Sequence, residues 1–187
     1  MQGDKEMIKI SRRAIATAAA VLAAGTGSVT WVATSASAAT AKPAAPSSVI
    51  GRCSASQLGV WVNADSANGA AGTIYYHLDL TNTSRWTCYL YGWPGVSATN
   101  WAGGQLGQPA RRVADVRARV VNVPPGGTAH AALGWVVAQL SPSCKPTTAA
   151  LLKVYPPNNR GARHAFFPLS VCTKTWTLTV GRIQQGT

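Results

Sequence analysis

Glutamate is absent from the sequence beyond residue 38, and only three aspartates occur there: Asp65, Asp79 and Asp115. The usual glycosidases need two carboxyl groups flanking the scissile bond, so this scarcity argues against that class. The same segment contains no G-x-S-x-G motif of a serine hydrolase and no C-x-x-C motif of a redox or zinc site. We therefore expect a protein that is not an enzyme and uses no metal or other cofactor.

Sustained helical periodicity is also missing beyond residue 38. Sequence-specific nucleic-acid modules would show a recognition helix, zinc-ligand spacing or an aromatic RNA-binding signature. None of these is present, so a specific nucleic-acid partner is not expected.

The N-terminus has the three parts of an export signal. A basic segment ends at Arg13, an apolar stretch covers residues 14–24, and Ala36-Ser37-Ala38 forms an A-x-A cleavage site. We predict a signal peptide over residues 1–38, a flexible Ala/Pro/Ser-rich leader over 39–51 and a secreted domain over 52–187. The uncharged run is rich in small residues, which disfavours its retention as a membrane anchor. Export by the general or the twin-arginine route leaves the protein extracellular or loosely bound to the cell wall.

All four cysteines, Cys53, Cys88, Cys144 and Cys172, follow the predicted cleavage site. In an oxidising compartment they are expected to form two disulfides. Four cysteines allow three connectivities, and their spacing does not choose among them. We favour Cys53–Cys88 and Cys144–Cys172, because each would join an edge segment to a neighbouring strand.

Basic residues dominate the predicted mature segment. Thirteen lysines and arginines stand against the three aspartates, which gives a net charge of +10. Such a protein outside the cell will attract anionic envelope polymers, although solubility alone would also explain the charge. The arginines gather in only one place, at Arg111, Arg112, Arg117 and Arg119.

Alternation of apolar and polar residues dominates the remainder of the sequence. In 72–82, for example, Ile74, Tyr76, Leu78 and Leu80 fall on one face, which is typical of a half-buried strand. Turn residues such as Asn68-Gly69 punctuate the pattern. These segments predict an immunoglobulin-like antiparallel β-sandwich of about seven strands with two disulfides. The expected strands cover residues 57–62, 72–82, 86–90, 113–123, 129–135, 150–154 and 175–180.

Several motifs resemble a known family. They are Asn82-Thr-Ser-Arg-Trp-Thr-Cys88-Tyr-Leu-Tyr-Gly-Trp-Pro-Gly-Val96, Pro125-Gly-Gly-Thr-Ala-His-Ala-Ala-Leu133, Cys144-Lys-Pro146 and Leu152-Lys-Val-Tyr-Pro-Pro157. Together they are similar to an actinobacterial secreted domain catalogued as domain of unknown function 4232, over about residues 52–183. The resemblance implies an exported, disulfide-bonded β-domain with no established activity or binding residues.

One pair of residues suggests chemistry. His77 and Asp79 lie two apart on one strand face, where the aspartate could orient the imidazole. A nucleophile would also be needed, and Ser84 or Ser97 could be offered only by guesswork. We expect this pair to form part of a solvated polar face, and His130 to be structural.

Aromatic residues provide the candidate binding surface. If Cys88 and Leu90 face the core, strand geometry directs Tyr89 and Tyr91 outward, and Trp93 continues the alternation. Exposed rings could stack on sugars or attract arginines, whereas folding back of residues 94–110 would bury them. The proposed binding residues are Tyr89, Tyr91, Trp93, Trp101, Arg117 and Arg119.

The expected function is therefore a non-enzymatic module that binds an anionic cell-wall polymer or glycan. The alternative is a secreted protein-interaction or protease-inhibitor module, because small rigid domains bind with little ordering cost. In that case the segment 141–146 could present Lys145 to a protease.

Overall fold

The computed structural model describes residues 49–114, 116–137 and 143–186. The predicted signal peptide (1–38), the leader up to residue 48 and Asp115 lie outside the described residues. Within the described part, no helix has the length and hydropathy needed to cross a membrane.

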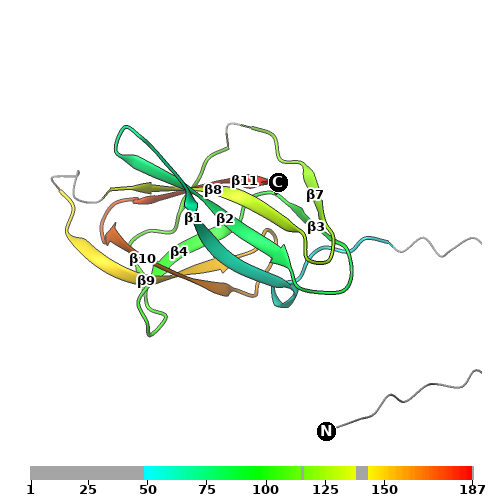
Figure 1. The fold of residues 1–187 in the computed structure, drawn as a ribbon. Coiled ribbons are helices and arrows are strands. Elements are labelled where there is room, and N and C mark those ends of the chain that lie inside the picture. Colours follow the sequence, from blue (N-terminus) through cyan, green and yellow to red (C-terminus); the bar gives the residue numbers. More distant parts are fainter. Residues whose placement is uncertain (1–48, 115, 138–142, 187) are drawn as a thin grey trace, which may run out of the picture. The chain divides into compact units, whose positions relative to one another are not determined.

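The described residues form an all-β structure with one short 3-10 helix, η1 (Ala55–Gln57), before the first strand (Figure 1). Seven strands have five or more residues, and two of these, at residues 95–99 and 163–172, lie outside the ranges predicted as strands. They are β1 (Leu58–Ala70), β2 (Thr73–Asn82), β4 (Gly95–Thr99), β8 (Thr128–Val136), β9 (Pro146–Tyr155), β10 (Arg163–Cys172) and β11 (Leu178–Gln185). Four shorter strands complete the set: β3 (Cys88–Tyr91), β5 (Gln105–Leu106), β6 (Arg111–Arg112) and β7 (Val120–Val123).

Two larger sheets and one short ribbon organise these strands. The first sheet has the order β1-β2-β8-β11-β6, the second has the order β10-β9-β4-β5, and β3 pairs with β7. All neighbouring strands are antiparallel except β11 and β6. Figure 1 shows β4, β9 and β10 lying across from β1, β2, β8 and β11, which is the layered arrangement of a sandwich. The all-β sandwich is confirmed, while its immunoglobulin-like topology stays a prediction.

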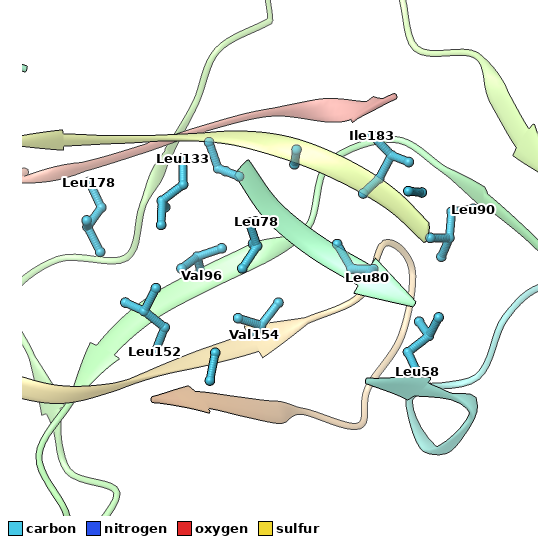
Figure 2. Close-up of a cluster of buried hydrophobic side chains, with 14 of the residues drawn as sticks. Leu58, Leu78, Leu80, Leu90, Val96, Leu133, Leu152, Val154, Leu178 and Ile183 are labelled. Carbon is cyan, nitrogen blue, oxygen red and sulfur yellow. The ribbon is translucent and has the colours of Figure 1, made fainter. Parts of the chain in front are cut away.

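The core fills the space between the two larger sheets. Figure 2 shows Leu78 of β2 and Leu133 of β8 directed toward Leu152 and Val154 of β9, and all four side chains are fully buried. Each fully buried side chain of this size contributes about 1.5–3 kcal/mol relative to an exposed one. Along β8, burial alternates from Thr128 to Leu133, as the periodicity predicts.

Two tryptophans within the expected strands 86–90 and 175–180 are exposed. Alternation along these ranges puts Trp86 in phase with Cys88 and Trp176 in phase with Leu178, yet the two side chains are 68% and 62% exposed. Strand β3 begins only at Cys88 and β11 only at Leu178. The period of two therefore does not extend back to either tryptophan.

The first hairpin turns later than predicted. The expected strand 57–62 continues as β1 to Ala70, and the turn lies at Ala71 and Gly72 rather than at Asn68-Gly69. Ala71 and Gly72 both have positive φ, 47° and 80°, as a tight two-residue hairpin requires. The polar segment between Asn63 and Asn68 instead forms an irregularity in the β1–β2 register.

The expected strand 113–123 is also shorter in the structure. Among the described residues of this range, strand is found at Val120–Val123 (β7), while the preceding Arg111–Arg112 (β6) pairs with β11. Arg111 and Arg112 therefore lie on β6, whereas Arg117 and Arg119 lie on the segment between β6 and β7, where both are exposed.

The four cysteines form two disulfides, Cys53–Cys88 and Cys144–Cys172, with Cα–Cα distances of 4.9 and 5.2 Å. The first connects the segment before η1 to β3. The second connects the segment before β9 to the end of β10. These are the two pairs that the sequence analysis favours, because each joins an edge segment to a neighbouring strand.

Candidate functional site

Strand β3 directs two tyrosines away from the core. Cys88 and Leu90 are buried, while Tyr89 is partly exposed and Tyr91 is 46% exposed. This alternation is the one predicted from strand geometry. Across the ribbon, Tyr91 lies opposite Val120 of β7.

Arg52 joins this outward face through backbone pairing. The Tyr89 N–H donates to the Gly51 carbonyl at 2.9 Å, and the Cys53 N–H donates to the Tyr89 carbonyl at 3.0 Å. Arg52 and Tyr89 thus form a parallel bridge. Because alternate residues of a strand face opposite sides, Cys53 turns inward to Cys88 while Arg52 turns outward.

Two adjoining hollows share Arg52. One, of about 350 Å³, is lined by Arg52, Tyr89, Tyr91 and Val120. The other, of about 450 Å³, is lined by Arg52 together with Arg85, Trp86 and seven neighbouring residues. We call Arg52, Arg85, Trp86, Tyr89 and Tyr91 the Arg52 surface.

The Arg52 surface is basic and aromatic. The Arg85 guanidinium lies 5.8 Å from the centroid of the Trp86 ring, which is cation–π range. Among the described residues, none that lines either hollow is an aspartate or a glutamate. The electrostatic potential here therefore favours anions.

The other predicted binding residues are distributed over separate places. The Trp93 indole N–H donates to the Val113 carbonyl at 2.8 Å, which holds this partly buried ring against the segment before β7. Trp101 is 73% exposed after β4 and stacks on Phe166 of β10, with ring centroids 5.7 Å apart. Trp101 lines a hollow with Phe166 rather than either hollow of the Arg52 surface.

The predicted arginines lie on the segment between β6 and β7. Arg117 and Arg119 are both exposed, and Arg119 directly precedes Val120, which lines the hollow beside Tyr91. Neither arginine lines the hollows themselves.

Sequence reasoning missed Arg52, Arg85 and Trp86. Arg52 could have been found, since a Cys53–Cys88 disulfide places its neighbour beside Tyr89. Trp86 falls inside the expected strand 86–90, in phase with the buried Cys88, although β3 begins only at Cys88. No pattern in the sequence singled out Arg85.

The segment proposed to present Lys145 is only partly described. Lys145 is exposed and follows the disulfide-bonded Cys144. Residues 141 and 142 lie outside the described residues, so the shape of this loop is not part of the structure.

A second polar site lies on the outer face of the first sheet. The β2–β8 register sets His130 opposite Asp79, and His77 lies two residues before Asp79 on β2. One potential ligand atom from each side chain falls within 4.8 Å of those of the other two. We call these three residues the histidine cluster.

Packing holds the histidine cluster together. The His77 and His130 rings stack with centroids 4.2 Å apart and planes inclined by 12°. Asp79 is only 9% exposed and lies opposite Trp61 in the β1–β2 register. A hollow of about 180 Å³ lies over the cluster.

Burial shifts both buried titrating groups toward their neutral forms. Burial raises the pKa of the Asp79 carboxyl, against the opposing effects of His130, His77 and the Trp61 side chain. Burial also lowers the pKa of His130, assisted by the nearby His77 and opposed by Asp79. The sequence predicted only a pair, His77 and Asp79. His130 completes the cluster because β8 pairs with β2 and sets it opposite Asp79.

Neither serine considered as a nucleophile reaches this cluster. The Ser84 hydroxyl donates to the Asn82 side-chain oxygen at 2.7 Å, and Ser97 is buried on β4 of the other sheet. Of the described residues that line the hollow over the cluster, none is a serine or a cysteine. The geometry there offers metal ligands rather than a catalytic triad.

Comparison with known proteins identifies a family. The sequence model of the family described as Domain of unknown function (DUF4232) matches residues 53–187, which is most of the chain. Neither a curated protein nor a solved structure matches the chain significantly. The function must therefore be argued from the residues described above.

Proposed function

We propose that this chain, which belongs to the DUF4232 family, is a secreted, non-enzymatic domain that binds an anionic polymer or glycan of the cell envelope. The observation that most strongly supports this proposal is the Arg52 surface, where two arginines and three exposed or partly exposed aromatic rings line adjoining hollows. The export signal in the sequence and the two disulfides support an extracellular location.

The side chains of this surface suit a charged polysaccharide. Arginine can donate two parallel hydrogen bonds to a phosphate or carboxylate group, which gives both attraction and orientation. The apolar faces of Trp86 and Tyr91 provide flat areas for the apolar faces of sugar rings. A polymer with alternating sugar and anionic groups would engage both kinds of side chain.

The charge of the whole domain strengthens this attraction. Acidic residues are rare beyond residue 38, and Asp79, one of three, is nearly buried. A field of one sign raises the rate at which an oppositely charged polymer arrives, while the Arg52 surface supplies the contact.

A non-enzymatic role fits the same residues. The described residues that line the two hollows include no histidine, aspartate, glutamate or serine. Histidine and carboxylates are the most common general acids and bases, and serine is a common nucleophile. The side chains of these hollows therefore favour binding over catalysis.

Calorimetric titration with poly(glycerol phosphate) tests the proposal, with neutral dextran as the uncharged comparison. We expect binding of the phosphate polymer and loss of at least tenfold in affinity in the double variant Arg52→Ala/Arg85→Ala. The double variant Arg163→Ala/Lys174→Ala removes the same charge from exposed positions outside both hollows. Equal losses in the two double variants would reduce the effect to net charge and contradict the proposed surface.

Protease inhibition is the second candidate function. The exposed Lys145 beside the disulfide-bonded Cys144 is the observation that favours it. A panel of secreted trypsin-like proteases, which cleave after basic residues, tests this candidate. Inhibition at micromolar concentration that is lost in Lys145→Ala would support it, and no inhibition would end it.

A further inference from the structure

The histidine cluster shares no lining residue with the hollows of the Arg52 surface and carries a separate inference. We propose that His77, Asp79 and His130 bind a late first-row divalent transition-metal ion such as zinc(II) or copper(II). The proposal rests on the convergence of two imidazoles and one carboxylate from two paired strands.

The donor set selects the class of metal. Two imidazole nitrogens with one carboxylate oxygen suit zinc, copper and nickel, whereas calcium and magnesium prefer sites made of oxygen alone. For a given site of this kind, copper(II) is expected to bind more tightly than zinc(II). Three protein ligands would leave at least one coordination position open to water or an external ligand.

Metal binding requires the imidazoles to rotate. A tetrahedral ion with bonds of about 2.0–2.2 Å places its ligand atoms roughly 3.4 Å apart, and the potential ligand atoms of the cluster lie within 4.8 Å of one another. Because the two rings stack nearly in parallel, they must turn about their side-chain bonds so that a nitrogen of each faces the ion.

The surrounding residues support the ligands as expected for a metal site. Trp61, the β1 partner of Asp79, lines the same hollow, and polar groups of this kind beside a metal-binding carboxylate help to orient it. The His77 backbone N–H donates to the Ser66 hydroxyl at 2.7 Å, and that hydroxyl donates to the Asn63 carbonyl at 2.6 Å. The irregular part of β1 therefore holds the backbone of His77 in position.

The hollow over the cluster provides access for an ion. It is lined by Trp61, Asn63, His77, Asp79, Thr128, His130 and Gly186. A volume of about 180 Å³ accommodates an ion with its remaining water ligands. The site is therefore open to solvent on the side away from the sheet.

Calorimetric titration of the untagged full chain with zinc(II) and copper(II) tests this proposal, with magnesium(II) as the comparison. We expect one zinc or copper ion per chain and at least tenfold weaker binding in each of His77→Gln and His130→Gln. The matched control is His164→Gln, because His164 is the remaining histidine of the chain and is exposed on β10. Undiminished binding in the double variant His77→Gln/His130→Gln, or equal loss in His164→Gln, would overturn the proposal.

Electron paramagnetic resonance of bound copper(II) identifies the ligands independently of affinity. We expect hyperfine coupling from two imidazole nitrogens in the parent protein and from one in His130→Gln. A spectrum that His130→Gln leaves unchanged would contradict the assignment. Trp61→Phe should retain both couplings while weakening binding by about tenfold, since it removes a polar group beside Asp79 and none of the proposed ligands.

Discussion

Arg52 and Tyr89 form a parallel backbone bridge, although 37 positions separate them in the sequence. The bridge is flanked by the Cys53–Cys88 disulfide, which lies on the inward side of the same two segments. The Cys53–Cys88 disulfide, on the core side, thus fixes the register in which the Arg52 and Tyr89 side chains point toward solvent. This arrangement links the stability of the domain to the shape of the Arg52 surface.

Removal of each disulfide should separate stability from binding. The Cys53–Cys88 and Cys144–Cys172 bonds close loops of similar length, 35 and 28 residues. Urea unfolding of Cys53→Ala/Cys88→Ala and of Cys144→Ala/Cys172→Ala should therefore show similar losses, each about 2–5 kcal/mol. Only the first variant should also bind poly(glycerol phosphate) more weakly, because it releases the segment that carries Arg52. Equal loss of binding in two folded variants would contradict this link.

Trp86 should contribute to binding and little to stability. Its ring is largely exposed, so Trp86→Ala should change the free energy of unfolding by no more than about 0.5 kcal/mol. Exposed aromatic anchors often cost more than about 1.4 kcal/mol of binding when truncated, which is a tenfold loss of affinity. Trp176→Ala is the control, because Trp176 is similarly exposed but lines neither hollow of the Arg52 surface. Calorimetric titration compares them, and an equal effect of the two substitutions would count against Trp86.

Salt should weaken polymer binding through the Arg52 surface. Raising the ionic strength from about 0.01 to 0.15 M shortens the Debye length from roughly 30 to 8 Å, so exposed charges interact less. The affinity of the parent protein for poly(glycerol phosphate) should fall steeply over this range. The variant Arg52→Ala/Arg85→Ala should show a shallower decrease, measured by titration at several salt concentrations. An unchanged dependence in that variant would place the charged contacts elsewhere.

The core of the sandwich should respond strongly to truncation. Leu133 is fully buried between the sheets, so Leu133→Ala should lower the free energy of unfolding by about 2–5 kcal/mol. Val116→Ala, at a half-exposed position outside the strands, should change it by no more than about 0.5 kcal/mol. Chemical denaturation of both variants checks this difference, and a small effect at Leu133 would contradict the position of the core.

The alternating strands were predictable because burial on one face imposes a local period of two. The buried residues of β8 and the outward tyrosines of β3 both followed from that rule. The rule failed at Trp86 and Trp176, because hydrophobicity alone does not show where a strand begins. It also failed at Asn68-Gly69, where a typical turn sequence lies inside β1.

The candidate sites were less predictable because both depend on pairing between distant segments. His130 reaches Asp79 only through the β2–β8 register, and Arg52 reaches Tyr89 only through a parallel bridge. A single sequence specifies such registers through the whole packed structure rather than through local spacing. Trp101 shows the same limit. The residues around Trp101 in the sequence give no sign that its ring will stack on Phe166, which lies on β10.

The central claim is that the Arg52 surface binds an anionic polymer, and its most direct test is a titration followed by nuclear magnetic resonance. Isotopically labelled protein receives poly(glycerol phosphate) while the amide signals are recorded. The account predicts that the largest shifts occur at Arg52, Arg85, Trp86, Tyr89 and Tyr91, with little change at Arg163 or Lys174. Shifts spread evenly over exposed basic residues, or concentrated away from these five positions, would contradict it.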